Sequence, residues 1–159
     1  PPPTPRASMP ASMALRRLAG AAALFGAAGG TAAPAPLRVA AFSVYPGYAG
    51  NLAVTGSVQI GQHGDGTQVL SYRLAGADPA CGATQPDAAN ACGIHVHAGT
   101  SCADAQGHLY AGSLRGADPW LPVFYSARDG DASGAAVGVT TGLALADIEG
   151  RAFVVHDST

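Results

Sequence analysis

The stretch from residue 92 to residue 102 reads CGIHVHAGTSC, and two of its histidines, His95 and His97, flank a single valine. The apolar residues around them predict a short strand over residues 93–97. Because side chains at positions i and i+2 of a strand lie on one face, both imidazoles are expected to point the same way. That arrangement suits two ligands of one metal ion, although a His-x-His pair taken alone is more typical of two surface histidines.

The sequence around this strand favours an all-β fold. Short apolar stretches alternate with Gly, Pro, Asn and Asp, and no segment has the periodicity of an amphipathic helix. Turn residues at 61–66 and 129–131 predict two β-hairpins. Many short strands with such turns are typical of a β-sandwich or barrel. The predicted strands cover residues 39–44, 52–60, 67–74, 93–97, 123–127, 135–139 and 151–156, with a connection over residues 143–150.

Two of the three further histidines extend the candidate metal site. His63 falls in the first hairpin turn and is expected to be exposed and solvated. His108 follows the loop after the His-Val-His strand, and His156 ends the last predicted strand, which in a sandwich could lie beside residues 93–97. Four imidazoles without a suitable thiolate pair favour copper, zinc or nickel over calcium or magnesium.

Four sequence motifs together resemble the copper–zinc superoxide dismutase family, most of all the copper-only superoxide dismutase repeat proteins of fungi, oomycetes and algae. The resemblance covers residues 37–159 and implies a Greek-key β-sandwich or barrel. It also implies that copper cycles between copper(II) and copper(I), converting superoxide to oxygen and hydrogen peroxide. The four implied copper ligands are His95, His97, His108 and His156, and His108 is the implied proton donor. The motifs are CGIHVHAGTSC (92–102), GHLY (107–110), DPW (118–120) and VVHD (154–157).

The sequence departs from this family in its metal ligands. Two-metal members have further histidines and an aspartate after the position of His108, which in them bridges copper and zinc. Here no histidine lies between His108 and His156, and Asp118 and Asp129 alone cannot complete a zinc site with its usual ligands. We therefore expect one copper ion and no zinc.

A second departure lies at the C-terminus. Family members continue beyond the Val-Val-His motif to an anion-guiding arginine, a cysteine and a last core strand, whereas this sequence stops at Thr159. We therefore expect a C-terminally truncated domain whose last strand is missing. Arg115 and Arg151 are the nearest candidates for a guiding charge, and each is expected to be an ordinary surface arginine.

The cysteines fit this expectation. Three cysteines form at most one disulfide. Cys81 and Cys92 bracket a proline-containing loop, and we expect these two to pair. Cys102 remains, and a partner in the missing C-terminal segment accounts for it more simply than the alternative, a thiolate ligand of copper.

Residues 1–33 are interpreted as upstream residues followed by a secretory signal peptide. Met13 would be the start, Arg16 and Arg17 the charged region, and residues 18–28 the apolar run, which small residues follow. The alternative, a membrane anchor, needs a longer apolar run.

The remaining domain, residues 34–159, has five arginines and ten acidic residues, a net charge of 5 − 10 = −5. Nothing in this composition resembles a basic nucleic-acid-binding surface. We expect a secreted protein in an oxidising compartment, with cell-wall or surface association as one location and no membrane partner.

Two functions follow from these expectations. The first is a superoxide dismutase whose partner is the superoxide anion. The alternative is a non-catalytic, secreted copper-binding β-sandwich module, such as a copper-buffering module of a cell wall. A sandwich that keeps its histidines only for packing is disfavoured, because four histidines occupy four positions that match the family.

Overall fold

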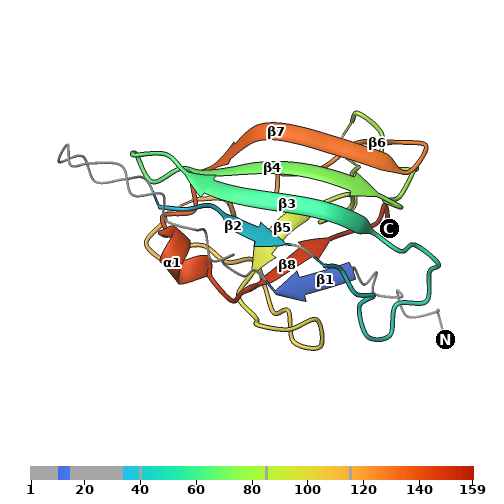
Figure 1. Cartoon of the computed structure of the whole chain (residues 1–159), viewed down its shortest axis with the longest axis horizontal. Helices are drawn as coiled ribbons and strands as arrows, with labels where there is room; N and C mark the ends of the chain where they lie inside the picture. Colours follow the sequence, from blue (N-terminus) through green and yellow to red (C-terminus); the bar gives the residue numbers. More distant parts are fainter. Residues whose placement is uncertain (1–10, 15–33, 40, 85, 115) are drawn as a thin grey trace, which may run out of the picture.

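The computed structural model describes residues 11–14, 34–39, 41–84, 86–114 and 116–159. These residues form two antiparallel sheets (Figure 1), which confirms the all-β prediction. The three-stranded sheet has the order β1-β8-β5, and the five-stranded sheet has the order β2-β3-β4-β7-β6. The elements are β1 Ala11–Ala14, β2 Leu37–Val39, β3 Thr55–Gln62, β4 Gln68–Ala75, β5 Ile94–His97, β6 Ala127–Arg128, β7 Asp131–Val139, α1 Leu145–Ile148 and β8 Ala152–Val155.

Both predicted hairpins are present. β3 and β4 pair in unbroken register from Thr55 opposite Ala75 to Gln62 opposite Gln68, around the predicted turn. β6 and β7 pair around Asp129 and Gly130, whose φ angles of 55° and 87° suit the tight turn of a hairpin. Turn chemistry in the sequence thus located both hairpins.

Several predicted strand bounds are wrong. The strand expected over residues 39–44 is β2, Leu37–Val39, because Leu37 and Val39 are buried whereas Val44 is 51% exposed. Only residue 127 of the strand expected over 123–127 is in β6, while β7 begins four residues before its predicted start. The expected connection over 143–150 contains the four-residue helix α1, which buries Leu145 and Ile148.

The main core lies between the two sheets. Val58, Ile60 and Leu70 of the five-stranded sheet join Val96 and Phe153 of the three-stranded sheet in one buried cluster. The other face of the three-stranded sheet is also covered, since Ala152 and Val154 of β8 pack in a smaller cluster. β5 and β8 are therefore buried on both faces. Along β5, His95 and His97 alternate with the main-core residues Ile94 and Val96, so the two histidines lie on the face turned away from the main core.

Strand β1 lies within the segment interpreted as upstream residues and signal peptide. Its four residues pair antiparallel with β8, from Ala11 opposite Val155 to Ala14 opposite Ala152. The rest of that segment, 1–10 and 15–33, lies outside the described residues, so the signal peptide stays a prediction. No helix in the described ranges is both long enough and apolar enough to cross a membrane.

The predicted disulfide between Cys81 and Cys92 is confirmed, with a Cα–Cα distance of 5.5 Å. It closes the loop that leads into β5, so the residues just before the His-Val-His strand are covalently tied to the segment that follows β4. A disulfide of this kind is weakly consistent with an extracellular protein.

Candidate metal centre

Three adjacent backbone segments bring four histidines together. β5 supplies His95 and His97, and β8 pairs with it on one side. His156 follows β8, and its backbone N–H donates to the carbonyl oxygen of Gly93 (2.8 Å). On the other side of β5, His108 forms an isolated antiparallel bridge with His97. Side chains directly opposite each other in antiparallel pairs share a face, so all four imidazoles lie on the outer face of the three-stranded sheet.

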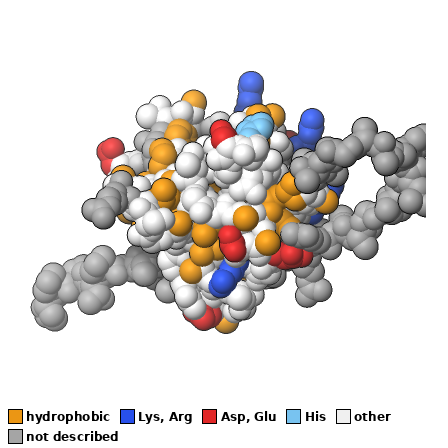
Figure 2. Space-filling model, turned by 90° about the vertical axis from the view of Figure 1, so that its left-hand side faces the viewer, with side chains coloured by type: hydrophobic (Ala, Val, Ile, Leu, Met, Phe, Trp, Pro, Cys, Tyr) orange, Lys and Arg blue, Asp and Glu red, His pale blue; other side chains and the backbone are white. Residues whose placement is uncertain are grey.

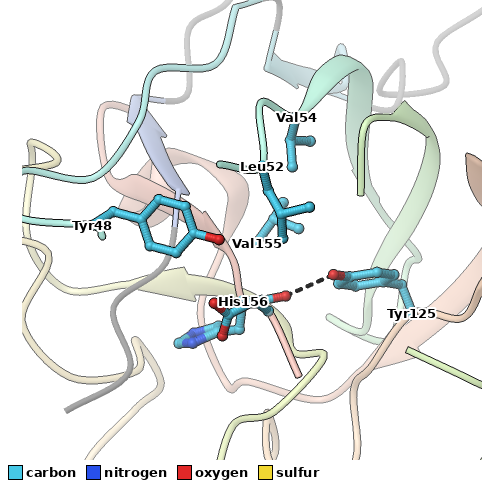
Figure 3. A pocket seen from close by; sticks show the side chains of 7 residues that line it. Tyr48, Leu52, Val54, Tyr125, Val155 and His156 are labelled. Atoms are coloured by element: carbon cyan, nitrogen blue, oxygen red, sulfur yellow. Dashed lines mark hydrogen bonds between the residues drawn. The ribbon is translucent and has the colours of Figure 1, made fainter. Parts of the chain in front are cut away.

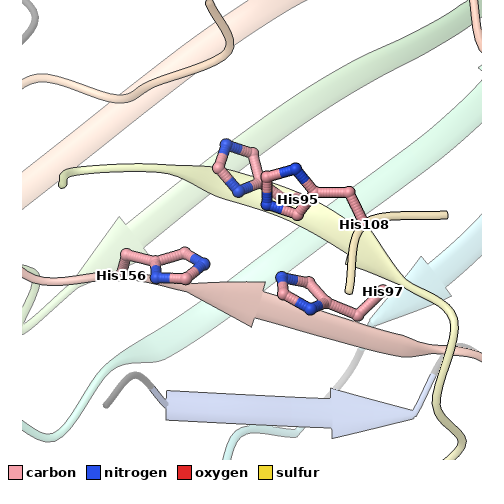
Figure 4. A group of neighbouring side chains, drawn as sticks. All are labelled: His95, His97, His108 and His156. Atoms are coloured by element: carbon pink, nitrogen blue, oxygen red, sulfur yellow. The ribbon is translucent and has the colours of Figure 1, made fainter. Parts of the chain in front are cut away.

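The four rings point toward one another (Figure 4). One ring nitrogen from each of His95, His97, His108 and His156 can be chosen so that all four atoms lie within 4.8 Å of one another. Two nitrogens bound to one ion at about 2.0–2.1 Å can be at most about 4.2 Å apart. The cluster therefore needs only a small contraction to surround a single ion. His95 and His97 are 1% and 7% exposed, so the donors are already largely removed from water.

Hydrogen bonds fix the tautomers of three rings. Carbonyl and carboxylate oxygens only accept, so the ring nitrogen facing each of them carries the hydrogen and the other nitrogen holds a lone pair. His97 Nδ1 donates to the carbonyl oxygen of Gln106 (2.7 Å). The other two bonds run from His95 Nε2 to the carbonyl oxygen of Val123 (2.8 Å) and from His108 Nδ1 to Asp118 Oδ2 (2.7 Å).

The remaining ring nitrogens lack partners. His95 Nδ1 and the Nε2 atoms of His97, His108 and His156 are buried, and none has a hydrogen-bond partner among the described residues. Buried polar atoms in folded proteins nearly always have partners, and leaving one without costs roughly 1–3 kcal/mol. Four such lone pairs at one point are explained if they coordinate a metal ion. The donor set, four imidazole nitrogens, suits copper, zinc or nickel.

Burial keeps three of the four imidazoles, those of His95, His97 and His156, neutral. It lowers the pKa of His95 to about 2 and that of His156 to about 3, and the neighbouring histidines add to both shifts. Burial also lowers the pKa of His97. Neutral imidazole is the metal-binding form, so the lone pairs are available at neutral pH without the loss of a proton.

These shifts predict that the metal-free protein loses stability in mild acid. Below the ordinary histidine pKa of 6.5, the unfolded chain binds protons at His95 and His156 that the folded chain cannot bind. The free energy of unfolding is therefore highest above pH 6.5 and falls as the pH drops toward the low folded-state pKa values. Thermal melts of metal-free protein from about pH 7 to about pH 5, above the range where carboxylates titrate, measure this loss. Equal melting temperatures across this range would contradict it.

The Asp-Pro-Trp motif holds His108 in place. Asp118 Oδ1 accepts the backbone N–H of Trp120 (2.9 Å), and Oδ2 binds His108. Trp120 is fully buried, and its indole N–H donates to the carbonyl oxygen of Leu109 (2.8 Å). The sequence carried no signal that Asp118 would orient a candidate ligand ten residues away.

Other candidate residues lie outside the cluster. His63 is exposed in the β3–β4 turn, as predicted. Cys102 is half-buried, and its Sγ lies 3.1 Å from Ser43 Oγ. Arg151 donates from Nη1 to the carbonyl oxygen of Ala98 (2.7 Å), and Arg115 lies outside the described residues. On the face seen in Figure 2, basic side chains are scattered among polar and apolar ones.

No family model, curated protein or solved structure matches this chain. The case for a function therefore rests on the site and on the sequence motifs.

Proposed function

We propose that this chain is a secreted copper protein of the superoxide dismutase type, which converts superoxide to oxygen and hydrogen peroxide at a single copper ion. The observation that carries the proposal is the convergence of four buried imidazole nitrogens without hydrogen-bond partners. Two antiparallel sheets around a shared core are compatible with the Greek-key sandwich that the resemblance implies. The disulfide between Cys81 and Cys92 fits a secreted protein.

The donor set supports a single metal ion, which we propose to be copper, with no second site for zinc among the described residues. Among the described residues, the four histidines are the one group of three or more potential ligands that lie close enough to share an ion. Asp118, the acidic residue beside them, is engaged by His108 and by the backbone of Trp120. When bound, copper supplies one-electron redox chemistry, which zinc cannot provide.

The histidines divide into two roles. His95, His97 and His156 would hold the ion. His108 is our candidate proton donor, because its Nδ1–H already donates to the Asp118 carboxylate. Its Nε2, which faces the other histidines, would carry the transferred proton while Nδ1 stays bonded to the carboxylate.

The alternative, a non-catalytic copper-binding module, is favoured by the distribution of charge. Positive charge near the metal speeds capture of an anion such as superoxide. The sequence contains no lysine, and the guanidinium of Arg151 is engaged by the carbonyl oxygen of Ala98. This lack of available positive charge is expected of a protein that binds copper without capturing superoxide efficiently.

Pulse radiolysis separates the two functions. Decay of superoxide is followed with the copper-loaded protein, and the zinc-loaded protein serves as the redox-inactive control. Decay that is accelerated in proportion to the copper-loaded protein, and not by the zinc form, supports the dismutase. Equal decay with both forms, despite full copper loading, would reject catalysis in favour of the binding module.

A further inference from the structure

His156 is held differently from the other three histidines. Each of those has a ring nitrogen fixed by an acceptor, whereas no described residue makes a hydrogen bond to the ring of His156. Its location is set through the backbone. The N–H of His156 donates to the carbonyl oxygen of Gly93 (2.8 Å), and the next carbonyl, of Asp157, accepts the N–H of Cys92 (2.7 Å). The carbonyl oxygen of His156 itself accepts the hydroxyl of Tyr125 (2.8 Å).

The Tyr125 hydroxyl is aimed at this carbonyl. Tyr125 is 1% exposed, and because a carbonyl oxygen only accepts, the hydroxyl must donate in this bond. Its backbone N–H donates to the carbonyl oxygen of Cys92 (2.9 Å). The hydroxyl oxygen accepts the backbone N–H of Asp78 (3.4 Å). Because the hydroxyl oxygen accepts from Asp78, the hydroxyl hydrogen points away from Asp78 and toward the carbonyl oxygen of His156.

The surroundings offer His156 little replacement for this hydroxyl. Figure 3 shows a cavity between Tyr48, Tyr125 and His156, lined on one side by apolar residues. Its volume is about 10 Å³, at the lower limit for a single water molecule. No other described side chain donates to the carbonyl oxygen of His156. The apolar lining consists of Leu52, Val54 and Val155.

We propose that Tyr125 is a positioning residue for the metal centre, which acts by fixing the backbone of His156 so that Nε2 points at the ion. This proposal rests on the metal site of the proposed function, although it does not require catalysis. Without the hydroxyl, the His156 carbonyl loses its side-chain donor just after the end of β8. The ring has no hydrogen bond from the described residues to keep it aligned. Groups that orient ligands typically contribute 10–100-fold to metal affinity.

Tyr125→Phe and Tyr72→Phe form a matched pair. Tyr72 is a buried tyrosine (7% exposed) of the five-stranded sheet, and its hydroxyl makes no hydrogen bond among the described residues. We expect Tyr125→Phe to weaken copper binding roughly tenfold and to change the copper(II) electron paramagnetic resonance spectrum. Tyr72→Phe is expected to keep the affinity and the spectrum of the unaltered protein. A Tyr125→Phe protein with unaltered affinity and spectrum would overturn the proposal, even if its melting temperature fell.

A metal-free measurement keeps this test separate from the proposed function. The ring Cε1–H resonance of His156 in the nuclear magnetic resonance spectrum reports on its position without copper. We expect Tyr125→Phe to shift this resonance while Tyr72→Phe leaves it in place. If the unaltered protein binds no copper, the proposed function fails, and the resonance still decides the role of Tyr125. An unshifted resonance would reject that role.

Discussion

Replacing His95 with alanine is expected to abolish copper binding at stoichiometric concentrations. His95 is 1% exposed, and its Nδ1 is one of the four buried nitrogens without a partner. Loss of an outer-sphere partner typically costs about 10–100-fold in metal affinity, and loss of a ligand should cost more. Copper bound per protein, measured by mass after dialysis, tests the prediction.

The matched control for this change is His63→Ala. His63 lies exposed in the turn between β3 and β4, outside the histidine cluster. The control should bind copper as the unaltered protein does, and it should keep any superoxide dismutation. Equal copper retention by the His95→Ala and His63→Ala proteins would mean that the cluster is not the copper site.

A single methyl group at Gly93 is expected to have a comparable effect. A Cβ built at Gly93 would overlap the ring of His95 and would lie 2.7 Å from the carbonyl oxygen of Asn90. Gly93 lies opposite His156 in the strand pair, so its missing side chain would occupy the face that carries the histidines. Gly93→Ala should therefore displace the ring of His95 from the carbonyl oxygen of Val123 and weaken copper binding strongly. Overpacking of this kind typically costs about 1–3 kcal/mol of stability.

Gly107→Ala is the control for this change. Gly107 precedes His108, and a Cβ there would have no heavy atom within 4 Å. Copper titration and thermal melting of both variants give the comparison, with losses expected only for Gly93→Ala. A Gly93→Ala protein that binds copper with full affinity would show that His95 does not need its observed position.

The sequence predicted those parts of the site that depend on local geometry. The His-Val-His spacing on a strand predicted that His95 and His97 share a face, because alternation along a strand is a local property. The exposed position of His63 followed from the Gly- and Asp-rich turn around it. The pairing of Cys81 with Cys92 followed from their places at the two ends of one short loop.

Other parts depend on tertiary packing, which local patterns do not report. The apolar residues Phe42 and Val44 suggested a longer strand, yet Val44 is exposed and β2 ends at Val39. The bond between Asp118 and His108 depends on how a loop folds over the sheet. The pairing of β1 with β8 joins segments from the two ends of the sequence, and no pattern in either segment indicated it.

Mass measurement of the intact, folded protein after exposure to equal amounts of copper and zinc tests the central claim most directly. We predict one ion per chain, because the four histidines are the one group of three or more potential ligands close enough to share an ion among the described residues. We predict that this ion is copper and not zinc, because sites of a given donor set generally bind copper(II) more tightly than zinc. Binding of zinc in place of copper, of two ions, or of no ion would contradict a single copper centre built from His95, His97, His108 and His156.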